Sequence, residues 1–81
     1  MNPNTFQIDA FWDVDAAVWV ATSDDVPGLA TEADSFDALQ QKLRLMVPEL
    51  LMLNQVIAAD YSGTISFELI SHKQETIEVA S

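Results

Sequence analysis

A single helical pattern in the second half of the chain most constrains its fold. Apolar residues recur at three- and four-residue spacing from Phe36 to Ile57, whereas the segments before and after alternate apolar and polar residues. The first spacing is typical of an amphipathic helix, and the alternation is typical of strands with one buried face. The sequence therefore predicts one helix, over residues 35–55, packed on a small sheet.

Four segments are predicted to be strands, in the chain order strand, strand, strand, helix, strand. They cover residues 5–12, 16–22, 29–33 and 64–73, and a polar tail follows over residues 74–81. A chain of 81 residues is expected to form a single domain, residues 1–81. The predicted fold class is α+β, with three consecutive strands of a largely antiparallel sheet, then the helix, then the fourth strand.

The register of the first two strands decides where two aromatic residues lie. A hairpin loop over residues 13–15 places Ala10 opposite Val18 on the face that packs against the helix. Phe11 and Trp19 are then expected on the other face, where large aromatic side chains need a cover. A neighbouring subunit, a binding partner, or the protein's own loop or tail would supply that cover.

Turn and cap residues mark the ends of the predicted elements. Pro27 and Gly28 predict a type II turn, because proline fixes φ at its second position and glycine supplies the positive φ at its third. Asp34 or Ser35 is expected to cap the helix. Pro48 lies inside the helical pattern, where its missing N–H predicts a kink or a split into two shorter helices.

The helix is predicted to carry a second apolar side, formed by Ala38, Leu45, Met52 and Val56. Either the C-terminal segment folds over this side, or a kink at Pro48 separates its members, or it serves as a surface for self-association or for a partner. We therefore take Leu45, Met52 and Val56 as candidates for an oligomer interface.

The charge of the chain favours basic partners over nucleic acids. Its net charge is −10, and the first 37 residues hold eight carboxylates and no Lys or Arg. Nonspecific nucleic-acid binding depends on Lys and Arg, so direct binding to DNA or RNA is not expected. The acidity serves either solubility or attraction of a basic protein. The candidate partner-binding residues are Phe11, Trp19, Asp24, Asp25 and Glu32.

Neither a catalytic centre, nor a cofactor site, nor a metal site is predicted. Cysteine is absent, which excludes disulfides, zinc-thiolate sites and a cysteine nucleophile. His72 is the only histidine and has no evident triad partners, and the carboxylates fall mostly in turns. Because no signal-peptide or membrane-spanning pattern is present, a cytoplasmic location is expected.

Two longer patterns resemble a known family. The run D-D-V-P-G-L-A-T-E-A-D-S-F-D-A-L, residues 24–39, resembles the signature of HicB-like antitoxin domains. Residues 12–33, together with V-P-E-L-L-M-L-N over residues 47–54, resemble a short uncharacterised subgroup of that superfamily. The resemblance implies a truncated ribonuclease-H-like fold. It also implies a partner, a small basic HicA-like toxin that cleaves messenger RNA, and this subgroup is expected to lack the DNA-binding module of fuller HicB proteins.

Three functions follow, in order of preference. The first is a non-catalytic interaction domain that binds and inhibits a small basic ribonuclease toxin. The second is a stand-alone homo-oligomeric scaffold. The third is a residual metal-dependent nuclease built on Asp9, for which the sequence offers no basic groove to seat nucleic acid.

Overall fold

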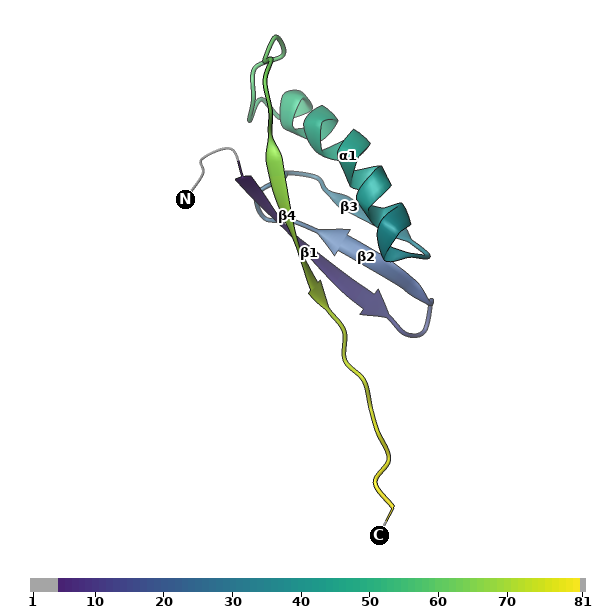
Figure 1. Cartoon of the computed structure of the whole chain (residues 1–81). Coiled ribbons are helices and arrows are strands. Elements are labelled where there is room, and N and C mark those ends of the chain that lie inside the picture. The colour runs from purple at the N-terminus through teal and green to yellow at the C-terminus, as the bar shows by residue number, and fades with distance from the viewer. Residues whose placement is uncertain (1–4, 81) are drawn as a thin grey trace.

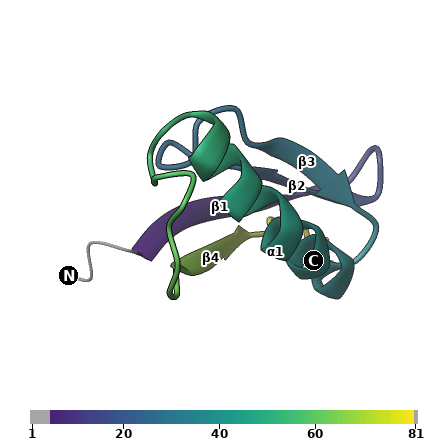
Figure 2. The same cartoon turned by 90° about the horizontal axis from the view of Figure 1, so that it is seen from above.

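One four-stranded sheet with a single helix on one face makes up the computed structural model, which describes residues 5–80 (Figures 1 and 2). The elements, in chain order, are β1 (Thr5–Asp13), β2 (Val18–Thr22), β3 (Ala30–Ala33), α1 (Phe36–Leu53) and β4 (Ser66–His72). The predicted α+β class is confirmed.

The sheet is mixed, with the strand order β3-β2-β1-β4. β1 pairs antiparallel with β2, and β2 pairs antiparallel with β3. β4 instead pairs in parallel with β1, from Thr5 opposite Ser66 to Phe11 opposite His72. The expectation of a largely antiparallel sheet is therefore wrong at this edge. A helical crossover returns the chain to the direction of β3, which is also the direction of β1, so the strand after it runs parallel to both.

The pairing of β1 with β2 differs from the predicted register. Ala10 lies opposite Ala21 rather than Val18, and Trp12 lies opposite Trp19. Paired residues share a face of the sheet, so Trp19 lies on the side of the helix and Val18 lies on the other side. The predicted placement of Trp19 beside Phe11 is therefore wrong.

A longer hairpin loop causes this shift. The Oδ1 atom of Asp13 accepts hydrogen bonds from the N–H groups of Asp15 and Ala16, both at 3.1 Å. Ala17 then adopts a left-handed backbone with φ of 57°, and its N–H donates to the Asp13 carbonyl at 2.8 Å. Residues 14–17 thus form the loop, and β2 begins later than predicted.

The core lies between α1 and the sheet. Its buried side chains are Ile8, Ala10, Ala21, Val26, Leu29, Ala33, Leu39, Leu43, Val47 and Leu51. The four buried helical residues recur at spacings of four, which is the pattern that one face of an amphipathic helix requires.

The helix begins where the sequence predicts and passes through its proline without a break. Ser35 is the N-cap, and its Oγ accepts a hydrogen bond from the N–H of Ala38 at 3.1 Å. The predicted split at Pro48 is wrong, since α1 is one helix from Phe36 to Leu53. Helix packing on the sheet offsets the lost donor, because Val47 beside the proline is buried. Gln55, with φ of 60°, turns the chain away just after the helix ends. Val56 therefore lies outside the helix.

The predicted turn at Pro27 and Gly28 is confirmed. The N–H of Leu29 donates to the Val26 carbonyl at 3.2 Å, and Gly28 has φ of 79°. The turn leads from β2 into β3 and buries Val26 against the helix side of the sheet.

After β4 the chain leaves the body of the domain. Residues 73–80, called the tail below, continue away from the sheet in Figure 1, and the longest extent of the molecule is 61 Å. The radius of gyration is 15.3 Å, whereas a compact chain of this length has one of about 12 Å. Across residues 5–80, no helix combines the length and the apolar character that a membrane span requires.

Candidate interaction surface

One face of the sheet is left open, because α1 packs on the opposite face (Figure 2). Strand alternation and the observed registers define this open surface, called the outer face. Its residues include Gln7, Asp9, Phe11, Val18, Val20, Glu32, Glu68, Ile70 and His72.

Phe11 lies at the centre of the outer face. Its neighbour on β2 is Val20, and its neighbour on β4 is His72. The rings of Phe11 and His72 are stacked, with centroids 4.7 Å apart and planes 15° from parallel. Nevertheless, 45% of Phe11 remains exposed. Val20 and His72 therefore flank the Phe11 side chain, and the part of the ring that they do not cover faces solvent.

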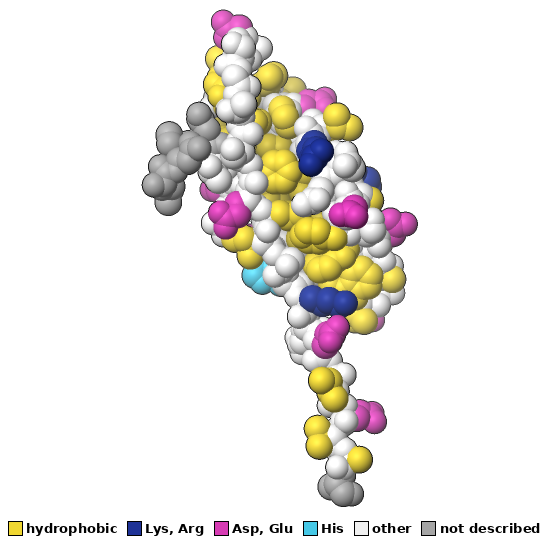
Figure 3. All heavy atoms as spheres, in the orientation of Figure 1, with side chains coloured by type: hydrophobic (Ala, Val, Ile, Leu, Met, Phe, Trp, Pro, Cys, Tyr) yellow, Lys and Arg dark blue, Asp and Glu magenta, His cyan; other side chains and the backbone are white. Residues whose placement is uncertain are grey.

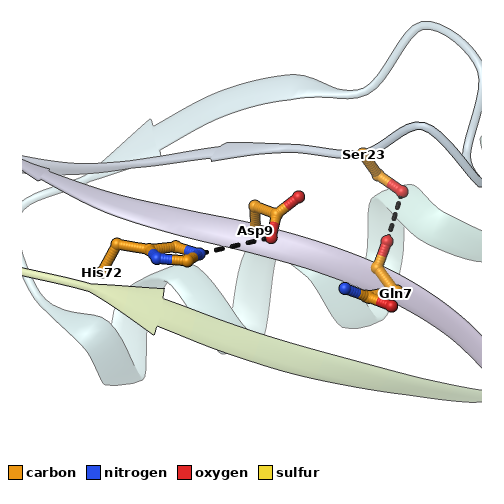
Figure 4. Close-up of polar contacts among 4 residues, drawn as sticks. All are labelled: Gln7, Asp9, Ser23 and His72. Atoms are coloured by element: carbon orange, nitrogen blue, oxygen red, sulfur yellow. Dashed lines mark hydrogen bonds and ion pairs between the residues drawn. The ribbon is translucent and has the colours of Figure 1, made fainter.

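His72 also contacts a carboxylate on the same face. Its Nε2 lies 3.4 Å from Oδ1 of Asp9, and the two side chains are 48% and 34% exposed (Figure 4). At this exposure an ion pair contributes little to stability. The contact with Asp9 instead helps to orient the imidazole ring of His72, which stacks on Phe11.

Carboxylates frame the apolar centre. Asp9, Glu32 and Glu68 all lie on the outer face, and none of its residues is Lys or Arg. Two of the three basic residues, Lys42 and Arg44, lie on α1 at the other side of the sheet. The outer face therefore presents an apolar patch that is surrounded by negative electrostatic potential.

Asp25, for which partner binding stays a prediction, also has a structural role. Its Oδ2 accepts the N–H of Gln7 at 2.8 Å. Ser23 donates from its hydroxyl to the Gln7 carbonyl (Figure 4). The same Oγ accepts the N–H groups of Asp25 and Val26. The pairing of β1 with β2 ends at Asp9, so these side chains satisfy the backbone of β1 beyond the ladder. Asp24 is exposed beside them.

Trp19 belongs to an aromatic cluster on the helix side of the sheet. Its ring meets Trp12 edge-on at 5.5 Å between centroids and Phe36 at 5.1 Å. Lys73 lies over the Trp12 ring, 5.5 Å from its centroid. The predicted position of Trp19 on the outer face is therefore wrong, because the shifted register takes it to the side of the helix.

The predicted oligomer residues are exposed but do not form one helical surface. Leu45 is 76% exposed and Met52 is 37% exposed, both on α1, whereas Val56, at 45%, lies beyond the end of the helix. Within residues 5–80, the tail does not fold over them, because it runs away from the helix (Figure 1).

The pairing of Phe11 with His72 has no local signal in the sequence. Stacking depends on β4 lying beside β1 in parallel, and alternation alone does not tell which strand a given strand will join. The predicted hairpin loop of three residues would place Val20 opposite Ile8 in the core, whereas the observed register places it beside Phe11 on the outer face. Within the described part of the chain, no group of three or more His, Asp or Glu side chains is arranged to hold a metal ion.

The fold and this surface define a class of small α+β domain with one helix-covered and one open sheet face. The chain belongs to the family described as a domain of unknown function, DUF1902, whose model matches residues 5–81. It is similar to a hypothetical protein of known crystal structure from the extremely thermophilic bacterium Thermus thermophilus, at 41% identity and a TM-score of 0.63. That match covers 93% of this chain and 99% of the other. No curated protein matches the chain.

Proposed function

We propose that this chain is a non-catalytic interaction domain whose outer face binds a small basic protein. The observation that supports this most directly is the half-exposed Phe11 ring, held between Val20 and His72 and surrounded by carboxylates. Binding interfaces concentrate their energy in such central aromatic residues, with a polar rim around them.

The charge of the rim selects the sign of the partner. Carboxylates around an apolar centre raise the association rate of a basic protein and repel acidic ones. A strand-borne surface also loses little conformational freedom on binding, because the sheet already fixes the backbone beneath it. The outer face therefore suits a preformed, basic partner with a complementary apolar patch.

The nature of the partner comes from the sequence resemblance. If the domain is a HicB-like antitoxin with a truncated ribonuclease-H-like fold, the partner is a HicA-like toxin that cleaves messenger RNA. Inhibition then requires only that the acidic face cover the basic RNA-binding surface of the toxin. No bond is made or broken by this chain.

The test is a binding measurement with a defined probe, a purified small basic toxin of the HicA-like kind. Calorimetry should show binding by the wild type. Phe11→Ala should weaken it by more than about tenfold, since truncation of a hot-spot residue costs about 2 kcal/mol or more. Val14→Ala is the matched control, because Val14 is 77% exposed in the hairpin loop, away from the outer face. Absence of binding by the wild type, or equal affinities for the two variants, contradicts the proposal.

Asp24 tests the electrostatic part separately. Asp24→Asn should slow association and reduce its salt dependence, because it removes a charge without removing the hydrogen bond that Asp25 makes. Glu75→Gln, which removes one charge from the tail, should leave the association rate closer to that of the wild type. Equal rates for Asp24→Asn and the wild type rule out a contribution of this turn to docking.

A second candidate function is a self-associating scaffold that uses α1. It is favoured by Leu45, which stands 76% exposed on the helix. Leu45→Asp should then abolish self-association while leaving the helix content measured by circular dichroism unchanged. Self-association that survives this substitution rules out α1 as the contact.

A further inference from the structure

β4 is an edge strand with an open hydrogen-bonding side. In the described sheet it has β1 on one side and no strand on the other. Natural edge strands are usually protected from pairing by lysine, proline or bulges. Ser66–His72 contains no Lys, Arg or Pro, and Glu68 is its one carboxylate. Its free edge is therefore a template for another strand.

The tail has the sequence pattern of a strand, but within the described residues no strand pairs with it. Ile77 and Val79 alternate with polar Thr76 and Glu78, which is period two. Ile77 is 81% exposed and Val79 is 89% exposed, and hydrophobic side chains stand on the projecting tail in Figure 3. The tail continues the line of β4 away from the domain (Figure 1). Pairing with a strand of a second chain would complete such a segment.

We propose that two copies of this chain pair through β4 and the tail, antiparallel, about a two-fold axis at Gln74. Each tail then runs along the free edge of the partner's β4, and the two sheets join into one. A two-fold contact of this kind is closed, because the same segments are used by both copies.

Side-chain alternation restricts the possible registers. Phe67 and Leu69 lie on the helix side, because they pair with Phe6 and Ile8. Continued alternation puts Ile77 and Val79 on that same side, since successive residues of a strand point to opposite faces. Apolar residues of the two copies therefore meet on one face only if residues of like parity are paired.

Charge selects among the remaining registers. An axis at Gln74 places Leu69 opposite the partner's Val79 and Lys73 opposite the partner's Glu75. Lys73 already lies 3.5 Å from Glu75 within its own chain. An axis at Lys73 would instead place the two Lys73 residues opposite each other and Glu68 opposite Glu78, and like charges in such pairs are destabilising.

The helix side of β4 offers apolar surface for the arriving tail. α1 contacts β2 and β3, so Phe67 and Leu69 are left half-buried. Figure 3 shows hydrophobic side chains in a band between β4 and α1. Ile77 and Val79 of the partner would extend this band and lose their own exposure to water.

The oligomeric state of the full chain tests the proposal. Sedimentation velocity should show a dimer whose dissociation constant rises by more than about tenfold in Ile77→Asp. Thr76→Asp adds the same charge on the opposite face and should have a smaller effect, and Leu45→Asp should have none. Both tail residues are exposed in the single chain, so circular dichroism should be unchanged. A wild type that is monomeric up to about 1 mM, or equal effects of the two tail substitutions, overturns the proposal.

Cross-linking tests the register. Because the chain has no cysteine, a single introduced thiol reports on one position. Residues facing each other across a two-fold antiparallel pair have Cα atoms about 4.5–5.5 Å apart, which suits a disulfide. Gln74→Cys should oxidise rapidly to a covalent dimer, and Val14→Cys should not. Equal yields for the two variants overturn the proposed axis.

Dimerisation at β4 is independent of the binding proposed for the outer face, and salt separates the two. Each copy has a net charge of −10, so added salt should strengthen the dimer by screening repulsion. The same salt should weaken association with a basic protein. Ile77→Asp should leave binding of the basic protein intact, whereas Phe11→Ala should leave the dimer intact. Failure of one proposal is thereby distinguished from failure of the other.

Discussion

The ring of Phe11 and the imidazole of His72 are stacked 4.7 Å apart, although these residues lie near opposite ends of the chain. The contact joins β1 to β4 across their parallel register, on the face that carries no helix. It is also the only stacked aromatic contact found on the outer face among residues 5–80. A pair of this kind both strengthens the sheet edge and positions Phe11 for contact.

His72→Ala should lower the free energy of unfolding by about 1 kcal/mol, because stacked aromatic pairs contribute about 0.5–1.5 kcal/mol beyond burial of area. His72→Phe should preserve most of the stability, since it keeps the ring and loses only an exposed contact with Asp9. Urea titration measures both. Glu68→Ala, on the same strand and face, is the control. If His72→Phe is as destabilising as His72→Ala, the ion pair rather than the stacking holds the contact.

Asp25→Ala should destabilise the fold by about 1 kcal/mol, since it leaves the N–H of Gln7 without its acceptor. Asp24→Ala removes the same charge from the neighbouring position and should change stability by less than about 0.5 kcal/mol, as expected for a surface substitution. Thermal unfolding of the two variants at one pH gives the comparison. Equal stabilities would mean that the turn is not held to β1 by the carboxylate.

Gly28→Ala should cost about 1 kcal/mol through the backbone alone. An added Cβ would lie 3.8 Å from the nearest atom, Cδ2 of Leu50, so no clash arises, but φ of 79° disfavours any side chain. Gly28→Asn should cost less, because asparagine tolerates a left-handed backbone better than alanine does. Unfolding in urea should rank the variants glycine, asparagine, alanine, and the reverse order of the last two would contradict the assigned turn.

Trp19→Ala should destabilise the domain by about 3 kcal/mol, because it removes the middle ring of the cluster with Trp12 and Phe36. Phe11→Ala should cost clearly less, since 45% of that residue is already exposed. Chemical denaturation distinguishes the observed register from the predicted one. In the predicted register the two aromatics share a face, and the two substitutions would have similar effects.

Elements with local signals were predictable from the sequence. The apolar spacing of α1, the Pro27-Gly28 turn and the Ser35 cap each depend on residues close together in the chain. The continuity of α1 through Pro48 was not predictable in this way, because it depends on tertiary packing of the helix on the sheet.

The faces of the sheet were harder to predict, because they depend on a loop length. The short side chain of Asp13 caps the hairpin, and Ala17 takes a conformation that its residue type rarely adopts. A shift of one residue in the pairing moves a side chain to the opposite face. Of the two aromatic residues expected on the outer face, Phe11 therefore lies there and Trp19 does not.

The parallel pairing of β1 with β4 also bears on how the chain matures on the ribosome. β1 emerges first and can pair at once with β2, but its other edge waits for a strand that follows the helix. Contacts between such distant segments form late, since a long loop must close before they are made. Until then, nascent chains on one messenger expose the same unpaired edge to one another. The parallel crossover thus makes completion of the sheet dependent on a strand that is synthesised only after the helix.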